Sequence, residues 1–197
     1  MNAELLREKL DKRLMDPKIL LGTAKFLTSS AQSAPVCNNF RYFPFYYYLG
    51  TQTSPQTVVQ IGSKLGLIGN CFMQGCKTVT SWLAMDGNRP PVNVIRSNLR
   101  MHCTGLVESM PLVREKLTAD GDTTPYIDMG FLTEKYDPEE MEIYLEFFWR
   151  NIKPEGLLVV DYIAFEAAKE VFNGFCRVKN REPVLFDTYC GVGILTR

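Results

Sequence analysis

The order of apolar segments predicts an α/β protein built on a doubly wound, mostly parallel sheet. Three observations support this class. An apolar run at 57–61 leads into a loop punctuated by glycines, a second apolar run at 157–161 is unbroken, and a helix is strongly indicated at 137–151. An unbroken apolar run is typical of a strand whose two faces are both covered by helices. Strands that alternate with helices favour a parallel sheet.

The N-terminal part is predicted to be a helical extension over 1–56, followed by one domain over 57–197. Leucines recur at helical spacing among charged residues over 5–14, which predicts an amphipathic helix that Pro17 prevents from continuing. At 197 residues with 46% hydrophobic content, the chain is long enough to bury one sizeable core.

Segment 40–49 places seven aromatic residues within ten positions and is predicted to form a helix beside the first strand. Aromatic side chains dominate the burial of apolar surface in cores, so core packing is the favoured interpretation. Stacking of an aromatic substrate or of nucleobases is the alternative.

The first half of the sheet domain is predicted to alternate between short strands and helices. In chain order we expect a strand at 57–61, a helix at 65–74, a strand at 77–85, a helix at 93–103, a strand at 105–109, a helix at 111–117 and a strand at 125–128.

The second half has the clearest local signals. Asp137 is expected to cap the helix at 137–151, because Pro138 suits a first helical position and the following acids favour the positive end of the helix dipole. A Pro-Glu-Gly turn then leads into the strand at 157–161. The last expected elements are a helix at 164–175 and an antiparallel hairpin of 184–189 with 192–196.

Charge and cysteine content restrict the environment. The 22 basic residues equal the 22 acidic residues, so no overall field draws nucleic acid or an anionic membrane, although Arg89, Arg96 and Arg100 leave a local basic patch open. The six cysteines show no metal-binding spacing and are expected to be free thiols. No run reaches the length of a membrane span, so we expect a soluble cytoplasmic protein.

The glycine loop after the first strand and the acid after the second indicate a nucleoside-bearing cofactor. Gly62 and Gly66 follow the first strand, and Asp86 stands twenty residues after Gly66. Such a loop lets backbone N–H groups approach a ligand, and an acid in this position accepts the hydroxyls of a ribose. The loop lacks both the G-x-G of dinucleotide sites and the Gly-Lys-Ser/Thr of phosphate-binding loops.

The whole order of elements over 57–197 resembles a class I S-adenosylmethionine-dependent methyltransferase with a seven-stranded Rossmann-like sheet, a closing antiparallel hairpin and an N-terminal helical extension. The most specific piece is Tyr136-Asp137-Pro138 together with the run from Lys153-Pro154-Glu155-Gly156 to Asp161-Tyr162. This piece is similar to the corresponding segment of macrocin-type O-methyltransferases.

The resemblance assigns roles to individual residues. It implies that Gln60, Gly62, Ser63 and Gly66 hold the methionine part of S-adenosylmethionine, that Asp86 binds the ribose, and that Ser109 lies near the adenine. It implies a divalent ion such as Mg²⁺ on Asp128, Glu134 and Asp161, with Asp128 and Asp161 as the catalytic pair. The chain departs from the pattern in having Gln60 instead of an acid and Asp161-Tyr162 instead of a pair of aspartates.

The function predicted from these features is methyl transfer from S-adenosylmethionine to a hydroxyl of a small molecule or sugar. A non-catalytic, methyltransferase-like binding or assembly subunit is the first alternative, and a nucleic-acid methyltransferase is the second. The expected partner is a small-molecule acceptor, without a membrane, and a homo-oligomer is left open.

Overall fold

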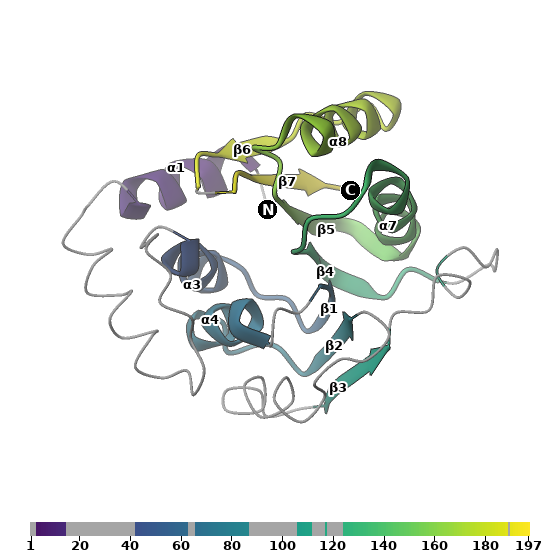
Figure 1. The fold of residues 1–197 in the computed structure, drawn as a ribbon. Helices are drawn as coiled ribbons and strands as arrows, with labels where there is room; N and C mark the ends of the chain where they lie inside the picture. The colour runs from purple at the N-terminus through teal and green to yellow at the C-terminus, as the bar shows by residue number, and fades with distance from the viewer. Residues whose placement is uncertain are drawn as a thin grey trace.

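A mixed seven-stranded sheet runs through the centre of the protein (Figure 1). The computed structural model describes residues 3–14, 42–62, 66–86, 106–111, 117, 124–188 and 190–197. The strands are β1 (Thr57–Ile61), β2 (Ser81–Asp86), β3 (Leu106–Pro111), β4 (Ile127–Leu132), β5 (Ile152–Asp161), β6 (Val184–Phe186) and β7 (Val192–Thr196), in the spatial order β3-β2-β1-β4-β5-β7-β6.

The strand directions match the predicted class. Strands β1 to β5 pair in parallel, whereas β7 runs antiparallel to both β5 and β6. The prediction of a mostly parallel α/β sheet with a closing antiparallel hairpin is therefore confirmed. The proposed division of the chain at residue 56 stays a prediction.

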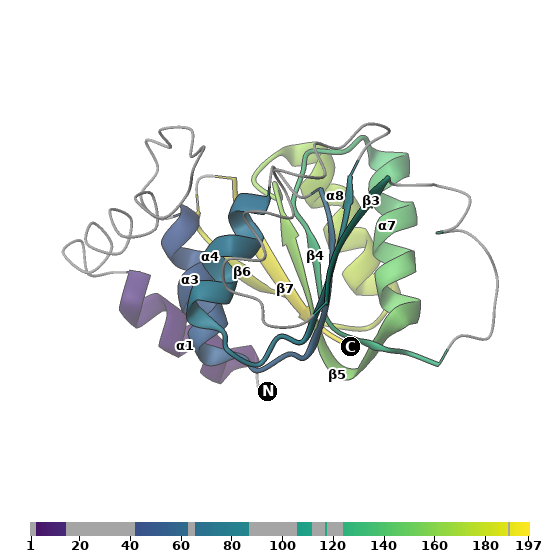
Figure 2. The ribbon, with the colours of Figure 1, turned by 90° about the horizontal axis from the view of Figure 1, so that it is seen from below.

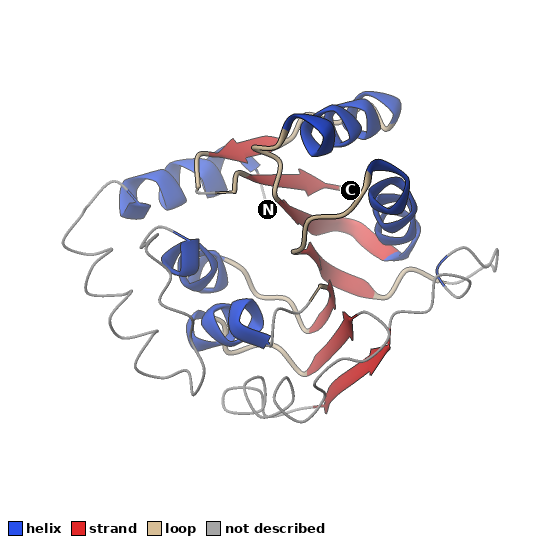
Figure 3. Ribbon diagram, in the orientation of Figure 1, coloured by secondary structure: helices blue, strands red, loops and turns tan. Residues whose placement is uncertain are grey.

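Helices cover both faces of the sheet, as Figures 2 and 3 show. One face carries α1 (Ala3–Leu14), α3 (Tyr42–Gln52) and α4 (Leu67–Gly75), and the other carries α7 (Pro138–Asn151) and α8 (Glu166–Val178). Neighbouring strand residues accordingly alternate between two buried clusters: Val58 and Phe131 belong to the first, Val59 and Leu132 to the second. No helix in the described ranges is long and apolar enough to cross a bilayer.

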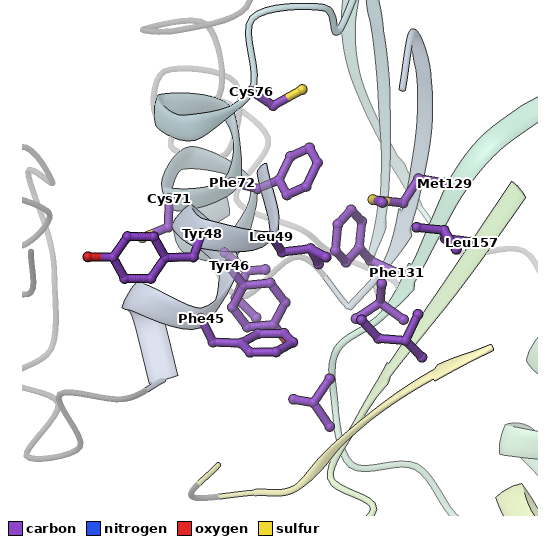
Figure 4. Packing of buried hydrophobic residues seen from close by; sticks show 14 of the residues in the cluster. Phe45, Tyr46, Tyr48, Leu49, Cys71, Phe72, Cys76, Met129, Phe131 and Leu157 are labelled. Atoms are coloured by element: carbon purple, nitrogen blue, oxygen red, sulfur yellow. The ribbon is translucent and has the colours of Figure 1, made fainter. Parts of the chain in front are cut away.

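The aromatic block is a core element wherever the structure describes it. Phe45, Tyr46 and Leu49 of α3 are fully buried, and Figure 4 shows this helix facing the side chains of the sheet. The Tyr46 ring lies 6.0 Å from that of Phe131, which in turn stacks on Trp82 at 5.7 Å. The core interpretation is therefore correct for the part of the block from 43 onward.

Local signals placed α7 correctly. Asp137 is its N-cap and its Oδ1 accepts a hydrogen bond from the backbone N–H of Glu140 at 2.9 Å. Because Met141, Leu145 and Phe148 recur at helical spacing, one stripe of the helix is buried against the sheet.

Several strand boundaries differ from the predictions, among them the start of β2 at Ser81 instead of 77 and the end of β6 at Phe186 instead of 189, and the difference in β4 moves a candidate site residue. Strand β4 was expected at 125–128 but extends to Leu132, because the apolar sequence continues past Asp128. Strand β5 begins at Ile152 and includes the predicted turn, which appears as an irregularity in the pairing with β4. The helix expected at 93–103 and most of the one at 111–117 lie outside the described residues; Pro111 itself ends β3.

Candidate functional site

The candidate site lies where the strand order reverses, at the carboxyl ends of β1 and β4. These strands are neighbours, although β2 and β3 follow β1 on one side and β5 follows β4 on the other. Open α/β sheets bind ligands outside the carboxyl ends of their strands at such a reversal point. This edge brings together the residues that follow β1, β2, β4 and β5.

Gly62 occupies a position that only glycine fills easily. Its φ is +81°, and a Cβ built on it would lie 2.6 Å from both Glu134 Cγ and Tyr136 Oη. Its N–H donates to the Met85 carbonyl at 2.9 Å, which joins the ends of β1 and β2. Gly66 has φ +78° at the start of α4. The predicted role of Ser63 falls on a residue outside the described part.

Gln60 is completely buried, and its amide is fixed by two acceptors. Its Nε2 donates to Thr133 Oγ1 at 2.8 Å and to the Gly62 carbonyl at 3.3 Å, while the Thr133 hydroxyl also donates to that carbonyl. Because the Thr133 hydroxyl donates its hydrogen to the Gly62 carbonyl, it can only accept from Gln60, so the amide nitrogen of Gln60 must face Thr133. Among the residues that the structure describes, the buried Gln60 Oε1 atom has no hydrogen-bond partner.

Two acids approach Tyr136 at this edge. Burial is the main cause that raises the pKa of Tyr136, followed by the negative charge of Glu134, with Asp86 contributing further. Asp86 is the last residue of β2 and is half-buried, and its predicted contact with a ribose stays a prediction. Ser109 lies in β3 opposite Ala84, and its predicted contact with adenine stays a prediction.

Asp161 and Tyr162 lie at the carboxyl end of β5, on the other side of the candidate site from Asp86. Asp161 is 2% exposed and accepts a hydrogen bond from the backbone N–H of Tyr162 at 2.8 Å. Tyr162 has φ +66°, a strained conformation for a bulky residue. Burial raises the pKa of Tyr162 to about 12, and the Cys190 thiol, Asp161 and Glu134 raise it further.

Asp128 does not belong to this site. It is the second residue of β4 and therefore lies at the amino edge of the sheet. Its Oδ2 accepts hydrogen bonds from the backbone N–H groups of Gln56 and Thr57 at 2.9 and 2.8 Å, and its Oδ1 pairs with Lys153 Nζ at 2.8 Å. The prediction of Asp128 as a catalytic and metal-binding residue is wrong, because β4 continues for four residues beyond it.

Partial burial acts to raise the pKa of Asp128, but Lys153 and the two backbone N–H groups outweigh it, so the pKa is lowered. The carboxylate thus holds together the amino-terminal parts of β1, β4 and β5.

The remaining residues do not fit the predicted magnesium site. Of the three proposed ligands only Glu134 and Asp161 stand at the carboxyl edge, and in the described ranges no three His, Cys, Asp or Glu side chains group as metal ligands. Magnesium requires near-octahedral oxygen coordination, usually with carboxylates in its inner sphere. No chemical step is therefore assigned to a metal here.

Three residues of this edge were not singled out as site residues from the sequence: Thr133, Tyr136 and Tyr162. Thr133 directly follows β4, so a correct strand end at Leu132 would have directed attention to it. Tyr162 carries no local signal, because its strained backbone appears only in the folded chain.

The fold is shared with known methyltransferases. No protein-family model and no curated protein sequence matches the chain. Among solved structures, the O-methyltransferase TomG from Streptomyces achromogenes in complex with SAM has a TM-score of 0.63 at 14% identity, covering 100% of this chain and 98% of that one. The O-methyltransferase from Bacillus cereus in complex with SAH has a TM-score of 0.62 at 12% identity, covering 99% and 98%.

A methyltransferase from Geobacter sulfurreducens has a TM-score of 0.60 at 17% identity and covers 100% of this chain and 96% of that one. At such low identity these likenesses establish the fold alone. The chain has the fold of the class I S-adenosylmethionine-dependent methyltransferases.

Proposed function

We propose that the protein binds S-adenosylmethionine at the carboxyl edge and transfers its methyl group to a hydroxyl of a small molecule or sugar. The observation that carries this proposal is the buried Gln60 Oε1 beside Gly62, which has no partner within the described part of the chain and lies at the reversal point of a methyltransferase fold. A buried acceptor without a partner costs free energy that a donor group on a ligand recovers.

The residues at this edge suit the parts of that cofactor. Gln60, Gly62 and Gly66 would hold the methionine part, where positive φ values let the backbone come close to a ligand. Asp86 would accept hydrogen bonds from the ribose hydroxyls, and Ser109 stays the candidate for the adenine side. When bound, the cofactor supplies an electrophilic methyl group on a sulfonium.

On the acceptor side the protein orients a hydroxyl and takes its proton. Asp161 remains from the predicted catalytic pair, and it ends β5 at the same edge. We assign it the role of proton acceptor, positioned by the backbone N–H of Tyr162. In-line placement of the hydroxyl and the methyl group supplies most of the remaining rate enhancement.

A non-catalytic subunit with this fold is the second candidate. The displacement of Asp128 to the opposite edge and the poor fit to a metal favour it. Such a subunit would use the sheet edge to bind a ligand or another protein without turnover.

Calorimetry with S-adenosylmethionine and S-adenosylhomocysteine tests the proposal. Saturable binding of one molecule per chain is the expected result, and no heat of binding would refute the methyltransferase assignment. Binding followed by methylation of a member of a panel of hydroxylated acceptors supports the enzyme. Binding without methylation across catechols, flavonoids and sugars favours the non-catalytic subunit.

A further inference from the structure

Because Gln60 stands where the family pattern has an acid, this position offers no negative charge to the cofactor. The methionine part carries an ammonium group with three N–H donors and a full positive charge. The Gln60 Oε1 can accept hydrogen bonds from this group but carries no charge, and its amide nitrogen already donates to Thr133 and Gly62. A carboxylate would bind the ammonium more strongly, because it adds the attraction between opposite charges to the hydrogen bond.

Glu134 lies against the same glycine that Gln60 contacts. A Cβ on Gly62 would come within 2.6 Å of Glu134 Cγ and 2.9 Å of its Cβ, so the stem of this side chain lies directly on the Gly62 backbone. Glu134 also follows Thr133, whose hydroxyl joins the Gln60 amide. Gln60 and Glu134 therefore approach Gly62 from two neighbouring strands, β1 and β4.

The negative charge of Glu134 acts on two tyrosines at this edge, Tyr136 and Tyr162. It contributes to the raised pKa of both Tyr136 and Tyr162, in each case after burial as the main cause. Both phenols therefore stay neutral at pH 7. The surroundings of Glu134 are partly buried, so its charge is less screened than that of a surface acid.

We infer that Glu134 supplies the charge that binds the ammonium group of the cofactor's methionine, together with the carbonyl oxygen of Gln60. The carboxylate thus stands at the second position after β4 instead of near the end of β1. This assignment rests on the proposed function, and it replaces the predicted role of Glu134 as a metal ligand.

The test compares two ligands that differ in the amino-acid part. S-adenosylhomocysteine carries the ammonium group, whereas 5′-methylthioadenosine shares the adenosine and sulfur but lacks the amino acid. In calorimetry on the full chain, Glu134→Gln is expected to weaken S-adenosylhomocysteine binding about tenfold to a hundredfold and to leave methylthioadenosine binding unchanged. Glu139→Gln, an exposed acid on α7, is the matched control and should change neither.

A charge returned to position 60 should rescue the variant. The double variant Gln60→Glu, Glu134→Gln is expected to regain the preference for S-adenosylhomocysteine, and it also decides the question if the single variant does not fold. Unchanged S-adenosylhomocysteine affinity in Glu134→Gln, equal loss for both ligands, or no rescue would each overturn the assignment. If the native chain binds neither ligand, the proposed function itself fails and this assignment fails with it.

Discussion

At the scale of single residues, the site depends on side chains whose partners are distant in sequence. Gln60 is bonded to Thr133, and Asp128 to Gln56 and Thr57, over separations of more than seventy residues. The types of residue could be read from the sequence, and so could the position of Asp86 near the end of a strand. The hydrogen-bond partner of each polar group could not be read from the sequence, because the fold determines which distant groups come together.

Asp86 gives a prediction at this scale. Asp86→Ala is expected to weaken S-adenosylhomocysteine binding by about 1 to 3 kcal/mol, because the ribose hydroxyls lose their acceptor in a half-buried site. Calorimetry measures the change, with the exposed Asp187→Ala as the control. An unchanged affinity would show that Asp86 does not bind the ribose.

At the scale of elements, helices α3 and α4 pack closely through two glycines. A Cβ on Gly50 would lie 2.2 Å from the Phe72 carbonyl oxygen, and one on Gly75 would lie 2.2 Å from the Tyr47 carbonyl oxygen. The contact was not predicted from the sequence, since both glycines sit near predicted helix ends and resembled ordinary termination signals. The strand at 57–61 and the helix capped by Asp137 were predicted correctly, because their signals are local.

Gly50→Ala is therefore expected to destabilise the fold by about 1 to 3 kcal/mol, since backbone cannot yield as a flexible side chain does. Gly174→Ala in α8 is the matched control, because its Cβ would meet no atom nearer than 3.9 Å. That change is expected to stabilise the helix by up to about 1 kcal/mol. Urea unfolding measures both, and equal stability of the two variants would contradict the close packing.

Asp128 gives a second prediction at this scale, because it joins the starts of three strands. Asp128→Ala leaves two backbone N–H groups without their acceptor and is expected to cost about 1 to 3 kcal/mol at pH 7. Lys153→Met removes only the partly exposed ion pair and should cost about 1 kcal/mol or less.

The pKa of Asp128 is lowered on folding, so its charged form stabilises the native state. This stabilisation is present above the ordinary value of 3.8 and is lost as the pH falls through the lower folded pKa. The difference in unfolding free energy between the native chain and Asp128→Ala should therefore narrow below about pH 4. A difference that stays constant from pH 7 to pH 3 would contradict the role of the carboxylate.

At the scale of the whole molecule, the sequence pattern predicts the fold but does not determine whether the site can hold a metal. The alternation of strands and helices can be predicted from the sequence. It brings the carboxyl ends of β1, β2, β4 and β5 to one edge of the sheet, where a cofactor can bind. Whether that edge also holds a metal depends on where β4 ends. Because β4 continues for four residues beyond its predicted end, Asp128 lies at the amino edge of the sheet, opposite the candidate site.

The prediction for the whole molecule is that cofactor binding and methyl transfer need no divalent ion. Only two of the three proposed carboxylates stand at the carboxyl edge, and each has another role assigned here: Glu134 binds the ammonium group and Asp161 accepts a proton. Added Mg²⁺ should therefore leave the affinity for S-adenosylhomocysteine unchanged, and EDTA should not reduce turnover of any acceptor found. Calorimetry and a methylation assay with Mg²⁺ or with EDTA measure this directly. Turnover that EDTA abolishes and Mg²⁺ restores would mean that oxygen ligands beyond these two acids complete a metal site.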